Sequence, residues 1–232
     1  MNVLSRVGWF PPKMFAGVLW LAGAAQLFAQ IGGLDAGFTP ANIQNGAQPG
    51  IVKAVVTQSD GKVIIAGDFT SIGGVARGRV ARLNVDGSLD TSFAAGIGAD
   101  GIVNAVALQT DGKLVIGGDF LLVDNVARSR IARLTATGAL DTTFNPGTGA
   151  NAAVYAVLVV SGSIHVGGDF TQINGVNRGR YAKLLSSGSI DQSFSGTGAN
   201  GSVYALATNG ATVYVGGLSP RLMIPPAADW LN

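Results

Sequence analysis

Two sets of aspartates recur through the sequence and could supply acid–base chemistry. The first set follows a glycine and precedes a phenylalanine, and comprises Asp68, Asp119 and Asp169. The second set stands in a Leu/Ile-Asp-x-x-Phe motif, and comprises Asp90, Asp141 and Asp191. Two carboxyl groups that flank a glycosidic bond can act as acid and as nucleophile or base. A carbohydrate-active enzyme, a hydrolase or a lyase, that uses such an Asp pair is therefore one hypothesis.

Arginines recur at matching intervals, and partly buried charges of this kind generally need partners. The two sets are Arg77, Arg128 and Arg178, and Arg79, Arg130 and Arg180. We interpret them as halves of a structural Asp–Arg interaction that is repeated in every unit. The alternative is a ring of arginines, as in sialidase-like sites, that binds anions or sugar acids. The absence of Glu and the regular repetition both weigh against an active site, which normally breaks the symmetry of a repeat.

His165 is the only histidine of the chain. It stands in an apolar segment at the position that Ile64 and Val115 hold in the other copies, which favours a structural role. One histidine cannot form a multi-histidine metal site, and no Gly-x-Ser-x-Gly motif accompanies it. The absence of Cys also excludes disulfides, thiolate metal sites and cysteine nucleophiles. We therefore predict no catalytic residue, no cofactor and no metal.

The polar residues belong to a repeat of about fifty residues. Gly-Asp-Phe occurs at 67–69, 118–120 and 168–170, and the Leu/Ile-Asp-x-x-Phe motif starts at 34, 89, 140 and 190. The seven phenylalanines beyond the N-terminal region fall at just two positions of the repeat, which predicts aromatic anchors between neighbouring units. They are Phe38, Phe93, Phe144 and Phe194, and Phe69, Phe120 and Phe170.

Each unit predicts four short strands. In the second unit these lie near 89–93, 103–109, 113–118 and 130–134, with an Asp-Gly hairpin turn at 111–112 and a loop of about ten residues before the last strand. The third strand is almost wholly apolar, which indicates that it is buried on both faces of its sheet. Four strands per fifty residues predict an all-β fold, a β-propeller array of antiparallel four-stranded blades. A parallel β-helix or solenoid is the alternative.

The array covers most of the chain. We expect units near 34–83, 89–134, 140–184 and 190–217, about 3.75 repeats, followed by a tail at 218–232 that matches no repeat. This count leaves three hypotheses open: a piece of a longer propeller, an imperfect closure of four blades, or edges that another chain covers.

These motifs resemble a known family. The pattern V-x-A-V-x-x-Q-x-D-G-K, then G-D-F, R-x-R-[IV]-A-R-L and G-[SA]-L-D-x-[ST]-F is similar to delta-60 repeats, a β-propeller domain of unknown function in bacterial exported and surface proteins. The resemblance covers about 34–217 and implies a propeller and an exported location, but no activity. Kelch units are a second, weaker resemblance, because their spaced Tyr and Trp residues are missing.

The N-terminal region has the pattern of a secretory signal peptide. Arg6 and Lys13 precede an apolar run of about fifteen residues, and small residues follow, so we expect residues 1–29 to be removed. An uncleaved N-terminal anchor is the alternative. The remaining basic residues then equal the 13 acidic ones, so nothing favours nucleic acid or an anionic membrane.

We therefore expect a secreted, periplasmic or cell-surface protein without a stable membrane span after cleavage of the leader. The leading hypothesis is a non-enzymatic interaction or surface scaffold, whose partner is a protein or a carbohydrate at the cell surface. The carbohydrate-active enzyme and the fragment of a longer propeller protein are the alternatives.

Overall fold

The computed structural model describes residues 41–94, 96–194, 196 and 198–218. In these ranges all regular secondary structure is β-strand, and every pairing between named strands is antiparallel. This excludes the parallel β-helix, whose coils stack in parallel. No helix in the described part of the chain is long and apolar enough to cross a membrane. The expected signal peptide at 1–29, the first motif at 34–38 and the tail from 219 lie outside the described residues.

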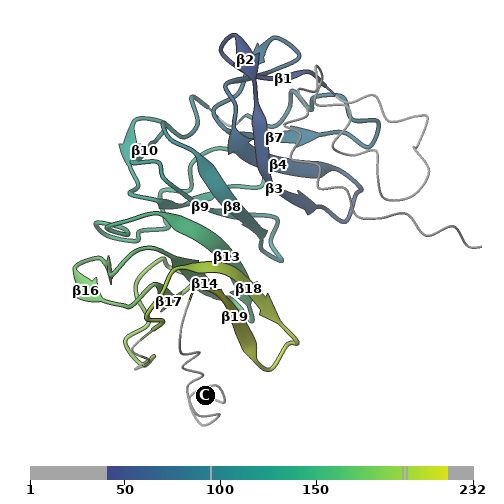
Figure 1. The fold of residues 1–232 in the computed structure, drawn as a ribbon. Helices are drawn as coiled ribbons and strands as arrows, with labels where there is room; N and C mark the ends of the chain where they lie inside the picture. Colours follow the sequence, from purple (N-terminus) through teal and green to yellow (C-terminus); the bar gives the residue numbers. More distant parts are fainter. Residues whose placement is uncertain (1–40, 95, 195, 197, 219–232) are drawn as a thin grey trace, which may run out of the picture.

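Four blades follow one another along the chain and form an open fan (Figure 1). The first strand of each blade contacts the first strand of the next blade, so these inner strands lie side by side along the inside of the fan. The inner strands are β3 (Ile51–Thr57), β8 (Val103–Leu108), β13 (Val154–Val160) and β18 (Val203–Thr208). The middle strands are β4 (Val63–Asp68), β9 (Leu114–Gly118), β14 (Ser163–Gly168) and β19 (Val213–Gly217).

A third strand completes the regular sheet in the first three blades. These outer strands are β7 (Val80–Leu83), β12 (Ile131–Leu134) and β17 (Tyr181–Leu184). The fourth strand position is reduced to one bridge, such as that between Leu83 and Leu89. The segment at 89–93, which we expected to open the second unit as a strand, thus lies on the edge of the first blade. There the backbone N–H of Asp90 donates to the carbonyl oxygen of Arg82 at 2.9 Å, and the Arg82 side chain donates to the Asp90 carboxylate.

The loop expected before each outer strand contains a small hairpin. Its strands are β5 (Ser71–Ile72) and β6 (Val75–Ala76), β10 (Leu122–Val123) and β11 (Val126–Ala127), and β15 (Gln172–Ile173) and β16 (Val176–Asn177). Both turn residues have positive φ in each case, as a tight hairpin turn requires, for example 52° at Asp124 and 62° at Asn125. Strands β1 (Ile43–Asn45) and β2 (Gln48–Pro49) extend the first of these hairpins.

The core consists of separate layers between neighbouring blades. Alternate residues of a middle strand face opposite neighbours: Leu114 and Ile116 belong to the layer shared with the first blade, and Val115 to the layer shared with the third. Phe93 and Phe120 are fully buried in the first of these layers, and Phe144 and Phe170 in the second. The continuous apolar middle strands of the second and third blades are therefore covered on both faces, because each of these two blades lies between two others.

Candidate functional site

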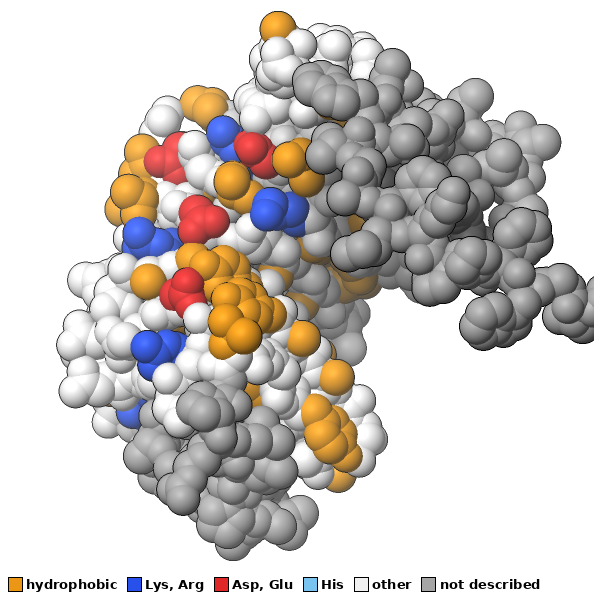
Figure 2. Space-filling view, viewed as in Figure 1, with side chains coloured by type: hydrophobic (Ala, Val, Ile, Leu, Met, Phe, Trp, Pro, Cys, Tyr) orange, Lys and Arg blue, Asp and Glu red, His pale blue; other side chains and the backbone are white. Residues whose placement is uncertain are grey.

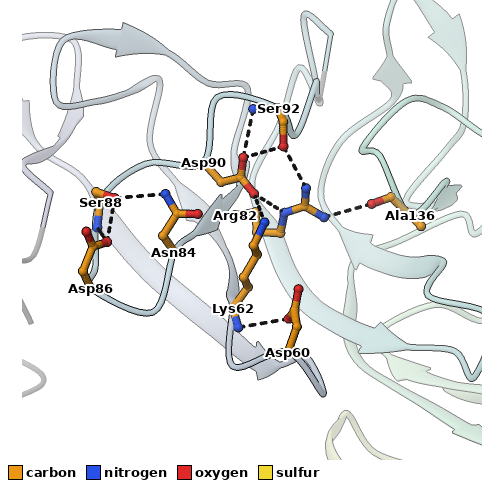
Figure 3. A network of polar contacts seen from close by, with 9 residues as sticks. All are labelled: Asp60, Lys62, Arg82, Asn84, Asp86, Ser88, Asp90, Ser92 and Ala136. Atoms are coloured by element: carbon orange, nitrogen blue, oxygen red, sulfur yellow. Dashed lines mark hydrogen bonds and ion pairs between the residues drawn. The ribbon is translucent and has the colours of Figure 1, made fainter.

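The aspartates of the Leu/Ile-Asp-x-x-Phe motif lie in buried ion-pair networks (Figure 3). Oδ2 of Asp90 accepts hydrogen bonds from Nζ of Lys62 and Nε of Arg82, both at 2.8 Å, and Oδ1 accepts one from the Ser92 hydroxyl at 2.6 Å. Partial burial by itself raises the pKa of Asp90, but the hydrogen bonds from Lys62, Ser92 and Arg82 outweigh it and hold the pKa well below its usual range. This carboxyl group is therefore a permanent anion at neutral pH.

The same networks also join successive blades. The Arg82 guanidinium donates to the carbonyl oxygen of Ala136, in the next unit, at 3.1 Å and lies 5.0 Å from the centroid of the Phe93 ring. In the second blade, Arg133 pairs with Asp141 at 2.8 Å and donates to the carbonyl oxygen of Ser186 at 2.6 Å. These charged groups are paired within the protein, and their hydrogen bonds to the next unit hold neighbouring blades together.

The third blade departs from this pattern. Ser163 stands where the other blades have Lys62 and Lys113, and Lys183 replaces the arginine, so Asp191 keeps one ion pair, at 3.1 Å. His165 and Tyr181 replace a pair of apolar residues that face the next blade, and Nδ1 of His165 lies 2.7 Å from the Tyr181 hydroxyl. Both side chains are buried. The lone histidine thus has a structural partner, as its place in an apolar strand indicated.

The aspartates of the Gly-Asp-Phe motif lie in a different place, at the ends of the middle strands. The glycine before each of them allows a close approach of the inner strand: a Cβ on Gly168 would overlap the carbonyl oxygen of Ala153. That carbonyl accepts a hydrogen bond from the backbone N–H of Asp169 at 2.9 Å. The approach fixes the aspartate beside the beginning of the inner strand.

Each inner strand has a β-bulge next to this aspartate. The pairing skips one residue between Val52 and Ala54, and at the equivalent places in the other three blades. Bulges commonly redirect a side chain beside functional sites. The bulged residues are a lysine, an asparagine and two tyrosines, and they form what we term the bulge row: Lys53, Asn104, Tyr155 and Tyr204.

Two residues of the bulge row donate hydrogen bonds to neighbouring aspartates. Nδ2 of Asn104 donates to Oδ2 of Asp119 at 2.9 Å, and the Tyr155 hydroxyl donates to Oδ2 of Asp169 at 2.7 Å. Hydrogen bonds from Ser202 and Tyr155 lower the pKa of Asp169, and the bond to Asp169, with burial, raises the pKa of Tyr155 to about 12. The carboxylate thus stays ionised and the phenol stays protonated at neutral pH.

Two tyrosines of the row lie side by side. The ring centroids of Tyr155 and Tyr204 are 5.2 Å apart with planes tilted by 30°. Tyr204 is 49% exposed although it belongs to an inner strand. On the face seen in Figure 2, hydrophobic side chains gather over the inner strands of the last two blades, next to acidic side chains. The corner between the third and fourth blades thus combines the exposed ring of Tyr204 with the nearby carboxylate of Asp169, which is bonded to Tyr155.

The arginines expected to pair with aspartate have mostly backbone partners. Arg79 and Arg130 donate to the carbonyl oxygens of Ala99 and Ala150 in the next unit, at 2.7 and 2.8 Å. Nε of Arg79 also lies 3.7 Å from Oδ1 of Asp68. Arg79, Arg130 and Arg180 all have positive φ, of 67°, 68° and 60°. The other set, Arg77, Arg128 and Arg178, donates to the carbonyl of the preceding residue.

Sequence reasoning missed the bulge row and the arginines that bind the second aspartate set. Arg82 and Arg133 lie in the R-x-A-R-L segment and were not singled out, although they pair with Asp90 and Asp141. The row itself occupies the variable position of the repeated V-x-A-V pattern. That variability was the available signal, because a position that holds three residue types in four copies of a regular repeat is not needed for the common architecture. Among the described residues, no group of acidic residues and histidine could hold a metal ion.

Comparisons with known proteins agree with the fold. A crystal structure of the computationally designed Ika4 protein is 15% identical, with a TM-score of 0.50, over 78% of this chain and 94% of that one. A crystal structure of the designed Ika8 protein is 16% identical, with a TM-score of 0.47, over 72% of this chain and 42% of that one, so the chain spans less than half of Ika8. At this identity, the likeness to Ika4 shows a similar fold alone. No curated protein matches the chain.

A family model provides the more specific result. The model of the beta-propeller domain of unknown function DUF5122 matches residues 58–93, 109–144 and 161–194. Each match runs from the hairpin turn before a middle strand to the phenylalanine of the Leu/Ile-Asp-x-x-Phe motif, and thus contains the middle strand, the outer strand and the bridge of one blade. Three repeats of this chain thus match the model of the DUF5122 beta-propeller domain, in agreement with the resemblance to delta-60 repeats.

Proposed function

We propose that the protein is an exported, non-enzymatic β-propeller that serves as an interaction scaffold and binds its partner along the bulge row. The observation that carries this proposal is that the polar residues fall into two groups, one bonded within the protein and one on the inner strands. The repeated Asp, Arg and Lys residues bind one another and the backbone between blades. The residues of the bulge row, a lysine, an asparagine and two tyrosines, lie on the adjacent inner strands, where a partner can contact several blades at once.

The protonation of the aspartates supports a binding role over glycoside hydrolysis. A hydrolase needs one carboxyl group with a raised pKa to protonate the leaving group. Hydrogen bonds lower the pKa of Asp169, and those of Asp90, Asp141 and Asp191 are lowered by hydrogen bonds that outweigh burial. These four groups are carboxylates at neutral pH, and none of them is suited to act as a general acid.

Export is the second part of the proposal and rests on the leader. The basic residues Arg6 and Lys13, the apolar run and the small residues after it suit a cleaved signal peptide ending near residue 29. Expression of the full chain in a bacterium, followed by fractionation and determination of the N-terminal residue, tests this part. An exported protein that begins near residue 30 supports it. A cytoplasmic chain that keeps Met1 contradicts it.

The scaffold role is tested by binding and turnover in one experiment. Labelled protein is added to isolated bacterial cell envelopes, and both retention and released reducing sugar are measured. We expect saturable retention without release of sugar, and a loss of retention when Lys53, Asn104 and Tyr204 are all changed to Ala. A triple Ala variant at the exposed positions Val85, Ile97 and Leu185 is the matched control and should bind like the parent. Sugar release that is abolished by Asp169→Asn would show an enzyme instead.

A further inference from the structure

We infer that Tyr204, Tyr155 and Asp169 form a subsite for an uncharged pyranose of a polysaccharide. This inference rests on the proposed binding role and names the chemical class of the ligand. A pyranose offers apolar C–H groups on its ring faces and hydroxyl donors around its edge. The corner between the last two blades offers the complementary surfaces for both.

The apolar half of the subsite is the ring of Tyr204. It lies on a β-bulge, its neighbour Tyr155 supports it at 5.2 Å, and 49% of its surface is exposed. The chain departs from the repeat here as well, because Leu218 takes the place of the aspartate that follows the glycine in the other blades. Its backbone N–H bonds to Ser202 as that of Asp169 bonds to Ala153, and its side chain is 68% exposed. An exposed tyrosine and an exposed leucine thus flank the same blade end.

The polar half is the carboxylate of Asp169. Its Oδ2 accepts the Tyr155 hydroxyl at 2.7 Å, which fixes the carboxylate and the aromatic ring relative to one another. An ionised carboxylate has about four acceptor positions, so it can bind the hydroxyl donors of a ligand while it holds Tyr155. Both groups are thus oriented before the ligand arrives, which lowers the entropic cost of binding.

The charge balance favours an uncharged ligand over a cation. The positive charge of Arg180 acts on Asp169, as that of Arg79 does on Asp68 at 3.7 Å. A carboxylate whose charge is partly offset by a nearby arginine attracts a lysine-rich peptide less strongly. It still accepts hydrogen bonds from neutral hydroxyl groups.

The row extends toward the second blade, which suits a chain of sugars. Nδ2 of Asn104 bonds to Asp119 at 2.9 Å and reaches the carbonyl oxygen of Val154, the residue before Tyr155, at 3.3 Å. A second polar pair of acceptor and donor therefore lies directly beside the tyrosines. A ligand with several linked pyranoses could contact both.

The test is affinity electrophoresis of the full chain in native gels that contain a soluble polysaccharide. The probes are dextran, mannan, laminarin and galactomannan, with polygalacturonate as the acidic and poly-lysine as the cationic comparison. We expect retardation by at least one neutral polysaccharide. Tyr204→Ala should weaken it about tenfold, the equivalent of a lost aromatic contact, and Tyr204→Phe should stay within about twofold because the stacking surface remains.

Tyr214→Ala is the matched control, because Tyr214 is 54% exposed on the adjacent strand of the same blade and lies outside the bulge row. It should bind like the parent. No retardation in any neutral gel, equal retardation of Tyr204→Ala and the parent, or retardation by poly-lysine or polygalacturonate alone would each overturn the inference. If the protein is still retained on cell envelopes in any of these cases, the scaffold role stands and only the sugar subsite is refuted. If neither retardation by a neutral polysaccharide nor retention on envelopes is seen, both proposals are refuted.

Discussion

The hydroxyl of Tyr155 and the carboxylate of Asp169 lie 2.7 Å apart, and they join an inner strand to the end of the middle strand that pairs with it. The tyrosine comes from a β-bulge and the aspartate follows a glycine that only a close approach of the two strands requires. A feature of the common repeat thereby positions a side chain whose type varies among the blades. Four predictions follow from this and from the other departures from the repeat.

Asp169→Asn should lower the pKa of Tyr155. The anionic acceptor stabilises the protonated phenol and opposes the phenolate, and so raises the pKa to about 12 from the ordinary value of 10.0. The amide has no charge, so the pKa should move most of the way back. NMR titration of tyrosine labelled at Cζ measures it. Asp119→Asn is the control, because Asp119 acts only through its more distant charge and should cause a smaller shift. An unchanged Tyr155 pKa in Asp169→Asn would contradict the hydrogen bond.

His165→Val should destabilise the protein more than the pair of changes His165→Val and Tyr181→Ile together. The single change leaves the buried Tyr181 hydroxyl without its partner at 2.7 Å, which costs about 1–3 kcal/mol. The double change recreates the Val115 and Ile131 pair of the second blade, which faces its neighbour without polar groups. Urea unfolding of the parent, both single variants and the double variant gives the coupling free energy. Additive effects would show that the two side chains do not interact.

The free energy of unfolding should fall between pH 6.5 and about pH 4. Burial lowers the pKa of His165 from 6.5 to about 4, with Lys183 adding to the effect, so the unfolded chain binds a proton in this range and the folded protein does not. Stability is therefore complete above pH 6.5 and is lost progressively as the pH falls toward 4, by about 3 kcal/mol in the limit.

Urea unfolding at several pH values between 4.5 and 7 measures this loss, and His165→Val should show a nearly flat profile over the same range. The aspartate networks act at lower pH: the pKa values of Asp90 and Asp141 are lowered, so their contribution is present above their usual pKa of 3.8 and is lost below it. An equally steep profile in His165→Val would assign the pH dependence to other groups.

Asp141→Asn should destabilise the protein more than Asp191→Asn. The first change leaves the buried guanidinium of Arg133 without its anion, and we expect a loss of about 3 kcal/mol. Asp191 has a single ion pair, with a lysine whose side chain is 22% exposed and can reach water, so we expect a loss of about 1 kcal/mol. Thermal or urea unfolding compares the two variants directly. The reverse order would show that the ion pair of Arg133 with Asp141 stabilises the protein less than the ion pair of Lys183 with Asp191.

Much of the architecture could be predicted because the same sequence motifs recur in several units. The Gly-Asp-Phe and Leu/Ile-Asp-x-x-Phe motifs share one period, and four of their phenylalanines are buried between neighbouring blades as predicted: Phe93, Phe120, Phe144 and Phe170. The apolar middle strands and the Asp-Gly turns before them were also recognised. The small hairpins were missed, because turns such as Asp124-Asn125 connect strands of two residues that leave no alternation to detect.

The pairing of charges was harder to predict than the charges themselves. Asp90 and Arg82 are eight residues apart, and the sequence offers several arginines at similar distances. Only the return of the chain along the edge of the outer strand selects Arg82. Asn104 and Tyr155 escaped notice for the opposite reason, since a search for recurring residues passes over a position that varies.

The sequence alone determined the period, the β class, the apolar strands and the family resemblance, because each of these depends on neighbours along the chain. Only the tertiary structure decided that the segment at 89–93 belongs to the preceding blade, that Arg82 and Arg133 hold the aspartates, and that four different bulged residues form one row. These relations join residues of different strands and blades. The row results from the side-by-side packing of inner strands, which brings positions about fifty residues apart into contact. The ion pairs result from the return of the chain along the edge of the outer strand.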